Sequence, residues 1–139
     1  ADNIEKAIAS YQNALKVNTK ESFLNIRADP QTSLGHSYSN RIQGDRADNI
    51  EKAIASFQYA LEVYTKEAFP NDWALTQNNL GAAYSDRIQG DRAENLELAI
   101  AAFQYALKVR TKEAFRNQWA TTQSNLGTAY RNRILGDTA

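Results

Sequence analysis

Apolar residues recur along most of the chain at intervals of three and four, which is the spacing of one face of an α-helix. The clearest stripe lies within residues 50–64 and predicts an amphipathic helix of about five turns. Asp45 or Asp48 is the candidate N-cap of this helix, and Gly44 is expected to end the helix before it. The stripe consists of Ile50, Ala53, Ile54, Phe57, Ala60, Leu61 and Tyr64.

A second stripe, within residues 73–88, predicts a helix of a different kind. Asn71 or Asp72 is its candidate N-cap, and Pro70 is expected to stop the preceding helix. Gly90 is expected to supply the left-handed residue at its C-terminal end. The stripe consists of Trp73, Thr76, Leu80, Ala83, Tyr84 and Ile88, and it returns as Trp119, Leu126, Ala129, Tyr130 and Ile134 before Gly136.

The two helices alternate because the whole sequence repeats. The string ADNIEKAIAS at Ala1 reappears unchanged at Ala47, and the related AENLELAIAA begins at Ala93, so the period is 46 residues. Self-similarity at such a period is the mark of a solenoid, in which each unit buries its apolar face against its neighbours. We therefore expect one array over residues 1–139, with units 1–46, 47–92 and 93–139 and six helices in all. The chain begins and stops inside a unit, so we expect a fragment of a longer array.

The charge of the chain is balanced, with 16 lysines and arginines against 16 aspartates and glutamates. This balance removes the long-range field that would attract nucleic acid or an anionic membrane, so we expect neither as a partner. Cysteine is absent, which excludes disulfides and thiolate chemistry, and we expect a cytoplasmic location. No apolar run approaches the roughly 18 residues of a membrane span.

The sequence offers little to a catalytic or metal site. His36 is the one histidine, and a single imidazole without cysteine is a poor set of metal ligands. Nothing has the pattern of a nucleophile–base pair, a zinc motif or a phosphate-binding loop, because the glycines before Asp45, Asp91 and Asp137 stand alone. We therefore expect no enzyme activity, no cofactor and no metal.

The residues of both stripes resemble the tetratricopeptide repeat, whose helix pair carries Leu-Gly-x-x-Tyr and then Ala-x-x-x-Phe-x-x-Ala. The match falls on Leu34, Gly35, Tyr38, Ala53, Phe57 and Ala60; on Leu80, Gly81, Tyr84, Ala99, Phe103 and Ala106; and on Leu126, Gly127 and Tyr130, with Ala7, Tyr11 and Ala14 opening the chain. The resemblance implies an all-α, right-handed α-solenoid of antiparallel helix hairpins. The mid-helix glycines are then contact points that let an aromatic ring approach, since glycine in a helix costs about 1 kcal/mol relative to alanine.

The chain departs from the family in two ways. Its period is longer than the family's by about 12 residues, and glutamines occupy the family's first-helix tryptophan position, at Gln31, Gln77 and Gln123. Both helices are therefore expected to be longer than in the family. The strings TQNNLG and VYTKEAFP are also similar to those of long, highly self-similar tetratricopeptide arrays of cyanobacteria.

The resemblance implies a role as a protein–protein or peptide interaction scaffold within a larger protein. Partners of the family meet the concave face of the first helices, which on this sequence carries Thr32, His36, Ser39, Asn40, Asn78, Ala82, Ser85, Asp86, Ser124, Thr128, Arg131 and Asn132. These residues are mostly short and polar, which also fits a solvated face without a ligand. The alternative function is a structural spacer or self-assembling array that associates through the apolar faces of its terminal helices.

Arginine recurs with the period of the repeat at Arg41, Arg87 and Arg133. Near helix C-termini these cations suit the helix dipole, and we expect them to pair with Asp45 and Asp91 across the turn; an anion-binding stripe is the alternative. Trp73 and Trp119 are expected to pack in the core, against Phe69 and Phe115.

Overall fold

The computed structural model describes residues 2–17, 34–35, 37–38 and 44–138. These residues form the helices α1 (Asp2–Val17), α3 (Arg46–Val63), α4 (Pro70–Asp86), α5 (Arg92–Leu107) and α6 (Arg116–Thr138). Leu34, Gly35, Ser37 and Tyr38 are also helical. Four predicted site residues lie outside the described part of the chain, namely Thr32, His36, Ser39 and Asn40, as does Arg41.

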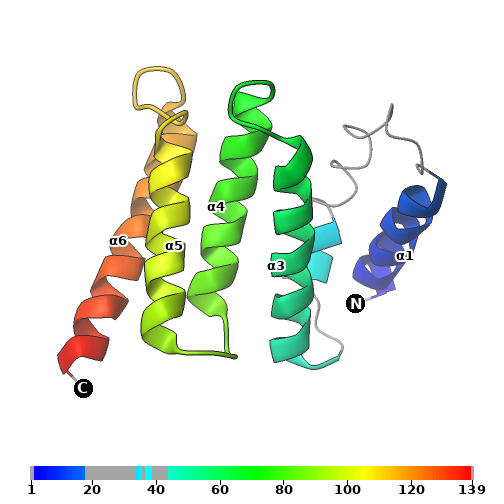
Figure 1. Ribbon diagram of the computed structural model, residues 1–139, viewed down its shortest axis with the longest axis horizontal. Coiled ribbons are helices and arrows are strands. Elements are labelled where there is room, and N and C mark those ends of the chain that lie inside the picture. The colour runs from blue at the N-terminus through cyan, green and yellow to red at the C-terminus, as the bar shows by residue number, and fades with distance from the viewer. Residues whose placement is uncertain (1, 18–33, 36, 39–43, 139) are drawn as a thin grey trace.

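The helices α3 to α6 stand side by side, and each runs in the direction opposite to the one before it (Figure 1). Turns at alternate ends of the stack join them, and α4 contacts α3 and α5 and also reaches α6. The prediction of an all-α fold of antiparallel helix hairpins is therefore confirmed. The right-handed sense of the solenoid stays a prediction.

The core is built from the residues that the repeat predicts. Phe57 and Phe103 are each 1% exposed, and the alanines one turn before and after them are fully buried. One continuous cluster joins the units and consists of Ile8, Leu34, Tyr38, Ile50, Ala53, Ile54, Phe57, Leu80, Ala83, Tyr84, Ala99, Ile100, Phe103, Leu126 and Ala129. This cluster draws on residues of all three units, so the described helices depend on their neighbours for burial.

A second regular contact joins residues within each 46-residue unit through tyrosine hydroxyls. Gln58 Nε2 donates to the hydroxyl of Tyr84 over 3.0 Å, and Gln104 Nε2 donates to that of Tyr130 over 3.0 Å. The same bond joins Gln12 of α1 to Tyr38 over 2.9 Å. The constant separation of 26 residues shows that α1 packs on its neighbour as α3 and α5 do on theirs.

The mid-helix glycines are points of close approach between helices. A Cβ atom added to Gly81 would lie 2.7 Å from Cε1 of Phe103, and one added to Gly35 would lie 2.8 Å from Cε1 of Phe57. Gly127 of α6 is different, because nothing in the described chain lies within 4 Å of its Cβ position. The expected role as contact points is confirmed for Gly35 and Gly81.

The predicted start of the helix at residues 73–88 is wrong. The N-cap of α4 is Phe69 rather than Asn71 or Asp72, and no side chain caps the helix. Pro70 is the first helical residue, where its fixed φ fits and its missing N–H costs nothing. It therefore begins α4, and α3 has already ended at Val63.

The predicted C-terminal end of this helix is also wrong. α4 ends at Asp86, because Arg87 turns into extended backbone (φ −60°, ψ 131°). Ile88 therefore leaves the buried stripe and is 60% exposed. In the next repeat α6 continues through Gly136 to Thr138, so that glycine does not end the helix, and Ile134 is 60% exposed.

Glycine and aspartate together set the turn before each helix of the α3 type. Gly44 and Gly90 have left-handed backbone, with φ of 85° and 84°. The left-handed conformation of Gly90 was predicted, but Gly90 lies beyond the end of α4 at Asp86 and not directly at it. The next residue caps the helix, since Asp45 Oδ1 accepts from Ala47 N over 3.1 Å and Asp91 Oδ1 accepts from Ala93 N over 3.2 Å. Of the two predicted caps, Asp45 is confirmed and Asp48 lies in the first turn.

Two glycine substitutions test whether ring contact holds the stack together. Gly81→Ala is expected to lower the free energy of unfolding by about 1–3 kcal/mol, because the buried Phe103 ring has no free space to move into. Gly127→Ala is the matched control and is expected to raise it by up to about 1 kcal/mol, the gain in helix propensity. Urea unfolding followed by circular dichroism measures both, and equal effects would contradict the packing described.

Candidate functional site

A groove lies between α4 and α6 where the family resemblance placed a binding face. It has a volume of about 190 Å³ and is lined by Ala82, Ser85, Asp86, Phe103, Asn125 and Thr128. Four predicted site residues, Ala82, Ser85, Asp86 and Thr128, therefore come together in one place. Asn125 and Phe103 were not predicted as lining residues.

Asn78 does not lie on the exposed face. It is 8% exposed, and its Oδ1 accepts from Thr122 Oγ1 over 3.0 Å and from Asn125 Nδ2 over 3.3 Å. Both donors belong to α6, so Asn78 joins α4 to α6 beneath the surface. Its placement on an exposed helix face is wrong, because α6 covers that part of α4.

The remaining predicted residues lie on α6 beside the groove. Ser124 and Arg131 are exposed and Asn132 is half-buried. Thr128 Oγ1 donates to the carbonyl of Ser124 over 3.1 Å, within its own helix. None of Ser124, Arg131 and Asn132 lines the groove.

The electrostatics at the end of the groove depend on two arginines from neighbouring helices. Arg46 lies 3.9 Å from the carboxylate of Asp86, and both side chains are about half exposed or more, at 49% and 63%. Arg92 donates from Nη1 to the carbonyl of Ser85. The arginines thus flank the C-terminal end of α4, where a cation is favoured by the helix dipole.

A buried polar chain continues from Asn78 toward the other end of α4. Thr122 is fully buried, and its hydroxyl accepts from Arg110 Nη1 over 3.1 Å while donating to Asn78. Arg110 follows α5 and is 9% exposed. Burial alone lowers the pKa of its guanidinium below the usual value.

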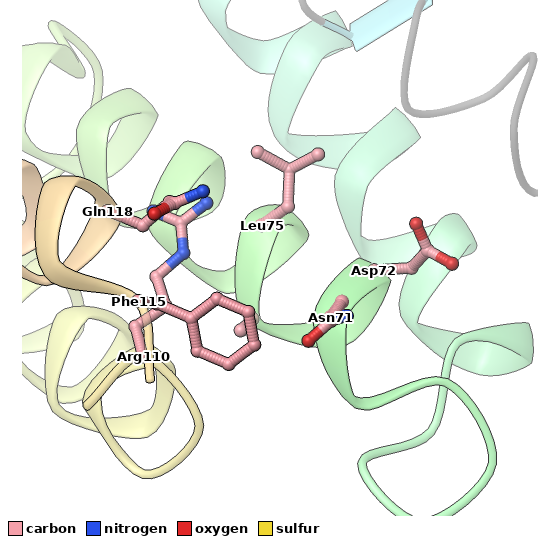
Figure 2. A pocket seen from close by; sticks show the side chains of 7 residues that line it. Asn71, Asp72, Leu75, Arg110, Phe115 and Gln118 are labelled. Carbon is pink, nitrogen blue, oxygen red and sulfur yellow. The ribbon is translucent and has the colours of Figure 1, made fainter. Parts of the chain in front are cut away.

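Arg110 also lines a larger cavity, of about 390 Å³, at the N-terminal end of α4. Figure 2 shows Asn71 and Asp72 on one side of it and Arg110 and Gln118 on the other. The lining consists of Asn71, Asp72, Ala74, Leu75, Arg110, Phe115 and Gln118. Sequence reasoning missed this cavity and did not single out Arg110, although the contrast with Tyr64, 46 residues earlier, marks the position.

Arg87 and Arg133 each pair with a glutamate of the preceding helix. Arg87 donates from Nε and Nη2 to the two carboxylate oxygens of Glu51 on α3, over 2.9 and 2.6 Å. Arg133 donates from Nη1 to Glu97 on α5 over 3.0 Å. The hydrogen bonds to Glu51 raise the pKa of Arg87. The predicted pairing of Arg87 with Asp91 is therefore wrong, because the guanidinium crosses to the preceding helix.

Trp73 packs in a small cluster with Ala60, Val63, Tyr64 and Phe69. It is half-buried, and its ring centroid lies 6.2 Å from that of Tyr105. The predicted contact of Trp73 with the Phe69 region is confirmed. Trp119 is also half-buried, with Lys112 Nζ 5.7 Å from the centre of its ring.

The described residues hold no group of three or more His, Cys, Asp and Glu side chains that could bind a metal ion. None of the helices described is long and apolar enough to cross a membrane.

The helix pair formed by α4 and α5 matches a known protein family. Residues 73–108 match the family model of the tetratricopeptide repeat. Residues 73–108 are therefore similar to a tetratricopeptide repeat. The match begins at Trp73 in α4 and ends at Lys108, directly after α5, so α4 and α5 are the two helices of one repeat. No curated protein and no solved structure matches the chain.

Tetratricopeptide repeats generally mediate protein–protein interactions, and proteins built from them are typically scaffolds without enzyme activity. The groove between α4 and α6 lies between the first helices of two successive repeats. The binding roles of Ala82, Ser85, Asp86, Thr128 and their neighbours remain predictions.

The two arginine–glutamate pairs offer a matched comparison of ion pairs between helices. Arg87 and Glu51 are 26% and 28% exposed, whereas Arg133 and Glu97 are 40% and 57% exposed. Glu51→Gln is expected to lower the free energy of unfolding by about 1–2 kcal/mol, because it removes a two-bonded charged contact. Glu97→Gln is expected to change it by less than about 0.5 kcal/mol. Urea midpoints measure both, and a larger loss for Glu97→Gln would refute the assignment.

Proposed function

We propose that this chain is an interaction scaffold that binds a segment of a partner protein along the face shared by α4 and α6. The groove lined by Ala82, Ser85, Asp86 and Thr128 is the observation that carries the proposal. It brings together side chains from successive repeats, so a bound segment would contact both repeats at once. The side chains of Ala82, Ser85 and Thr128 are short, so they leave room for the side chains of a bound segment.

The surrounding chemistry supports a peptide over other ligands. The groove offers a hydroxyl at Thr128, an amide at Asn125, a carboxylate at Asp86 and the apolar atoms of Ala82. Such a mixture of polar and apolar groups is typical of protein–protein contacts. We propose no enzyme activity for the chain and no nucleic-acid partner, in keeping with its balanced charge.

The proposal is tested with a library of random peptides displayed on phage and selected against the 139-residue chain. The double variant Ser85→Arg/Thr128→Arg fills the groove with two long side chains. Selected peptides are expected to bind this variant at least about tenfold more weakly than the wild type. Fluorescence anisotropy with labelled peptides measures the affinities.

The control is Glu62→Arg, an equally large change of charge at an exposed position on α3. Glu62 is the next-to-last residue of α3, and α3 ends at the end of the stack where α4 begins (Figure 1). This variant is expected to bind the peptides like the wild type. If no peptide is selected, or if all three proteins bind equally, the proposed function is wrong.

A further inference from the structure

Arg110 is a buried cation with few partners in the described part of the chain. It is 9% exposed, and its one hydrogen bond there runs from Nη1 to the hydroxyl of Thr122 over 3.1 Å. A guanidinium carries five N–H donors, so most of its capacity is unused by these residues. A charged group removed from water is unfavourable unless an opposite charge or hydrogen bonds replace the lost hydration.

No carboxylate among the described residues lies within 4.0 Å of this guanidinium. Asp72 lines the same cavity, but its carboxylate points away from Arg110 (Figure 2). The contrast with Arg87 is direct, because Glu51 raises the pKa of Arg87 while burial lowers that of Arg110.

The repeat shows that the fold does not require a charge at this position. Tyr64 stands 46 residues before Arg110, is 3% exposed and packs edge-on against Phe69, with ring centroids 5.5 Å apart. In the next repeat Phe115 occupies the position equivalent to Phe69, and Arg110 occupies the position equivalent to Tyr64. An uncharged side chain therefore fills the equivalent space in one repeat, and the other repeat has a cation there.

In the same unit, 93–139, a neutral residue also replaces an acidic one. Gln118 on α6 stands 46 residues after Asp72 on α4, so an amide occupies the position of an acid. Gln118 lines the cavity together with Arg110, on the same side of it in Figure 2. A carboxylate at residue 118 would give Arg110 a counter-ion from within the chain, and the sequence has the neutral side chain instead.

The cavity beside Arg110 has the size and lining to receive an anionic group from outside. Its volume is about 390 Å³, the exposed amides of Asn71 and Gln118 add N–H donors, and Phe115 and Leu75 supply apolar walls. Guanidinium groups recognise carboxylates through paired N–H bonds that strengthen away from water.

The cavity belongs to the same face of α4 as the groove. Asn71, Leu75 and Ala82 follow one another at intervals of four and seven residues, which places them along one side of a helix. The cavity lies at the N-terminal end of this face and the groove at its C-terminal end. The hydrogen-bonded chain from Asn78 to Thr122 and Arg110 connects the two beneath the surface.

We propose that the cavity binds the side-chain carboxylate of an aspartate or glutamate in a peptide partner, with Arg110 as its counter-ion. This inference rests on the proposed function, since it names the chemistry of the partner at one end of the shared face. The partner segment then places an acidic residue at the α5–α6 turn and runs along α4 toward Ser85.

The test titrates the 139-residue chain with two capped peptides of equal size, acetyl-Gly-Glu-Gly-amide and acetyl-Gly-Gln-Gly-amide, and with acetate. The readout is the NMR signal of the Arg110 Nε–H group, assigned by its loss in Arg110→Tyr. The glutamate peptide is expected to shift this signal saturably, with a Kd at least about tenfold lower than that of the glutamine peptide or of acetate.

Two variants take their design from the chain itself. Arg110→Tyr restores the residue of the preceding repeat and is expected to remove the difference between the two peptides, read from the amide signals of Gln118 and Leu75. Gln118→Glu supplies an internal carboxylate of the same size, so it is expected to raise the melting temperature of the chain. It is also expected to raise the Kd of the glutamate peptide at least about tenfold. If Arg110→Tyr does not fold, the binding measured with Gln118→Glu tests the inference by itself.

Equal binding of the glutamate and glutamine peptides would overturn the inference, as would unchanged binding by Gln118→Glu. Acetate binding as tightly as the glutamate peptide would also overturn it, because the site would then take free carboxylates and not a peptide side chain. The phage selection tests Ser85 and Thr128 at the other end of the face, so failure there and failure here are separate results.

Discussion

The stack of helices depends on one contact, an aromatic ring of the second helix of a repeat lying against a glycine of the first. In the repeat formed by α4 and α5 the ring of Phe103 leaves no space for a Cβ at Gly81, and the flanking Ala99 and Ala106 are fully buried. Small residues let two helices approach until a large ring fills the space between them, and dense packing then makes the arrangement specific. The same contact between Phe57 and Gly35 sets the preceding pair. Because the ring fixes how close the helices lie, it also fixes where the outward face of each first helix is presented.

Around this constant core the repeats differ in their polar contacts. The half-buried pair of Arg87 and Glu51 ties α4 to α3, and its counterpart on α6 is more exposed. The turn between α5 and α6 departs further, because Arg110 replaces the tyrosine of the repeat before it and joins the bonds that link α4 to α6. Several residues that differ between repeats, among them Ala82 and Thr128, lie where α4 and α6 meet, which is also where the groove lies. A scaffold gains specificity in this way, since the packing residues stay fixed while the exposed face changes.

Packing was predictable from the sequence, and contacts between distant polar groups were not. Phe103, Ala99 and Gly81 could be assigned because helix periodicity and the 46-residue repeat constrain them twice. The start of α4 was missed because proline at the first helical position replaced a side-chain cap. Arg87 was assigned to the nearby Asp91, whereas its partner Glu51 lies 36 residues earlier on α3. Asn78 was placed on an open face because periodicity within one helix does not show that α6 covers it. The role of Arg110 was not predicted, because it depends on the burial of the side chain, which the sequence of the turn does not indicate.

The contact between Phe103 and Gly81 is the central claim, and NMR measures it most directly. A nuclear Overhauser spectrum of the chain should show cross-peaks from the ring protons of Phe103 to the α-protons of Gly81. The α-protons of Gly127 should show no comparably strong cross-peak to an aromatic ring of another described helix, since nothing described lies within 4 Å of its Cβ position. Absence of the Gly81 cross-peaks in the folded protein would contradict the account, because the helices of the repeat would then not be held by this ring.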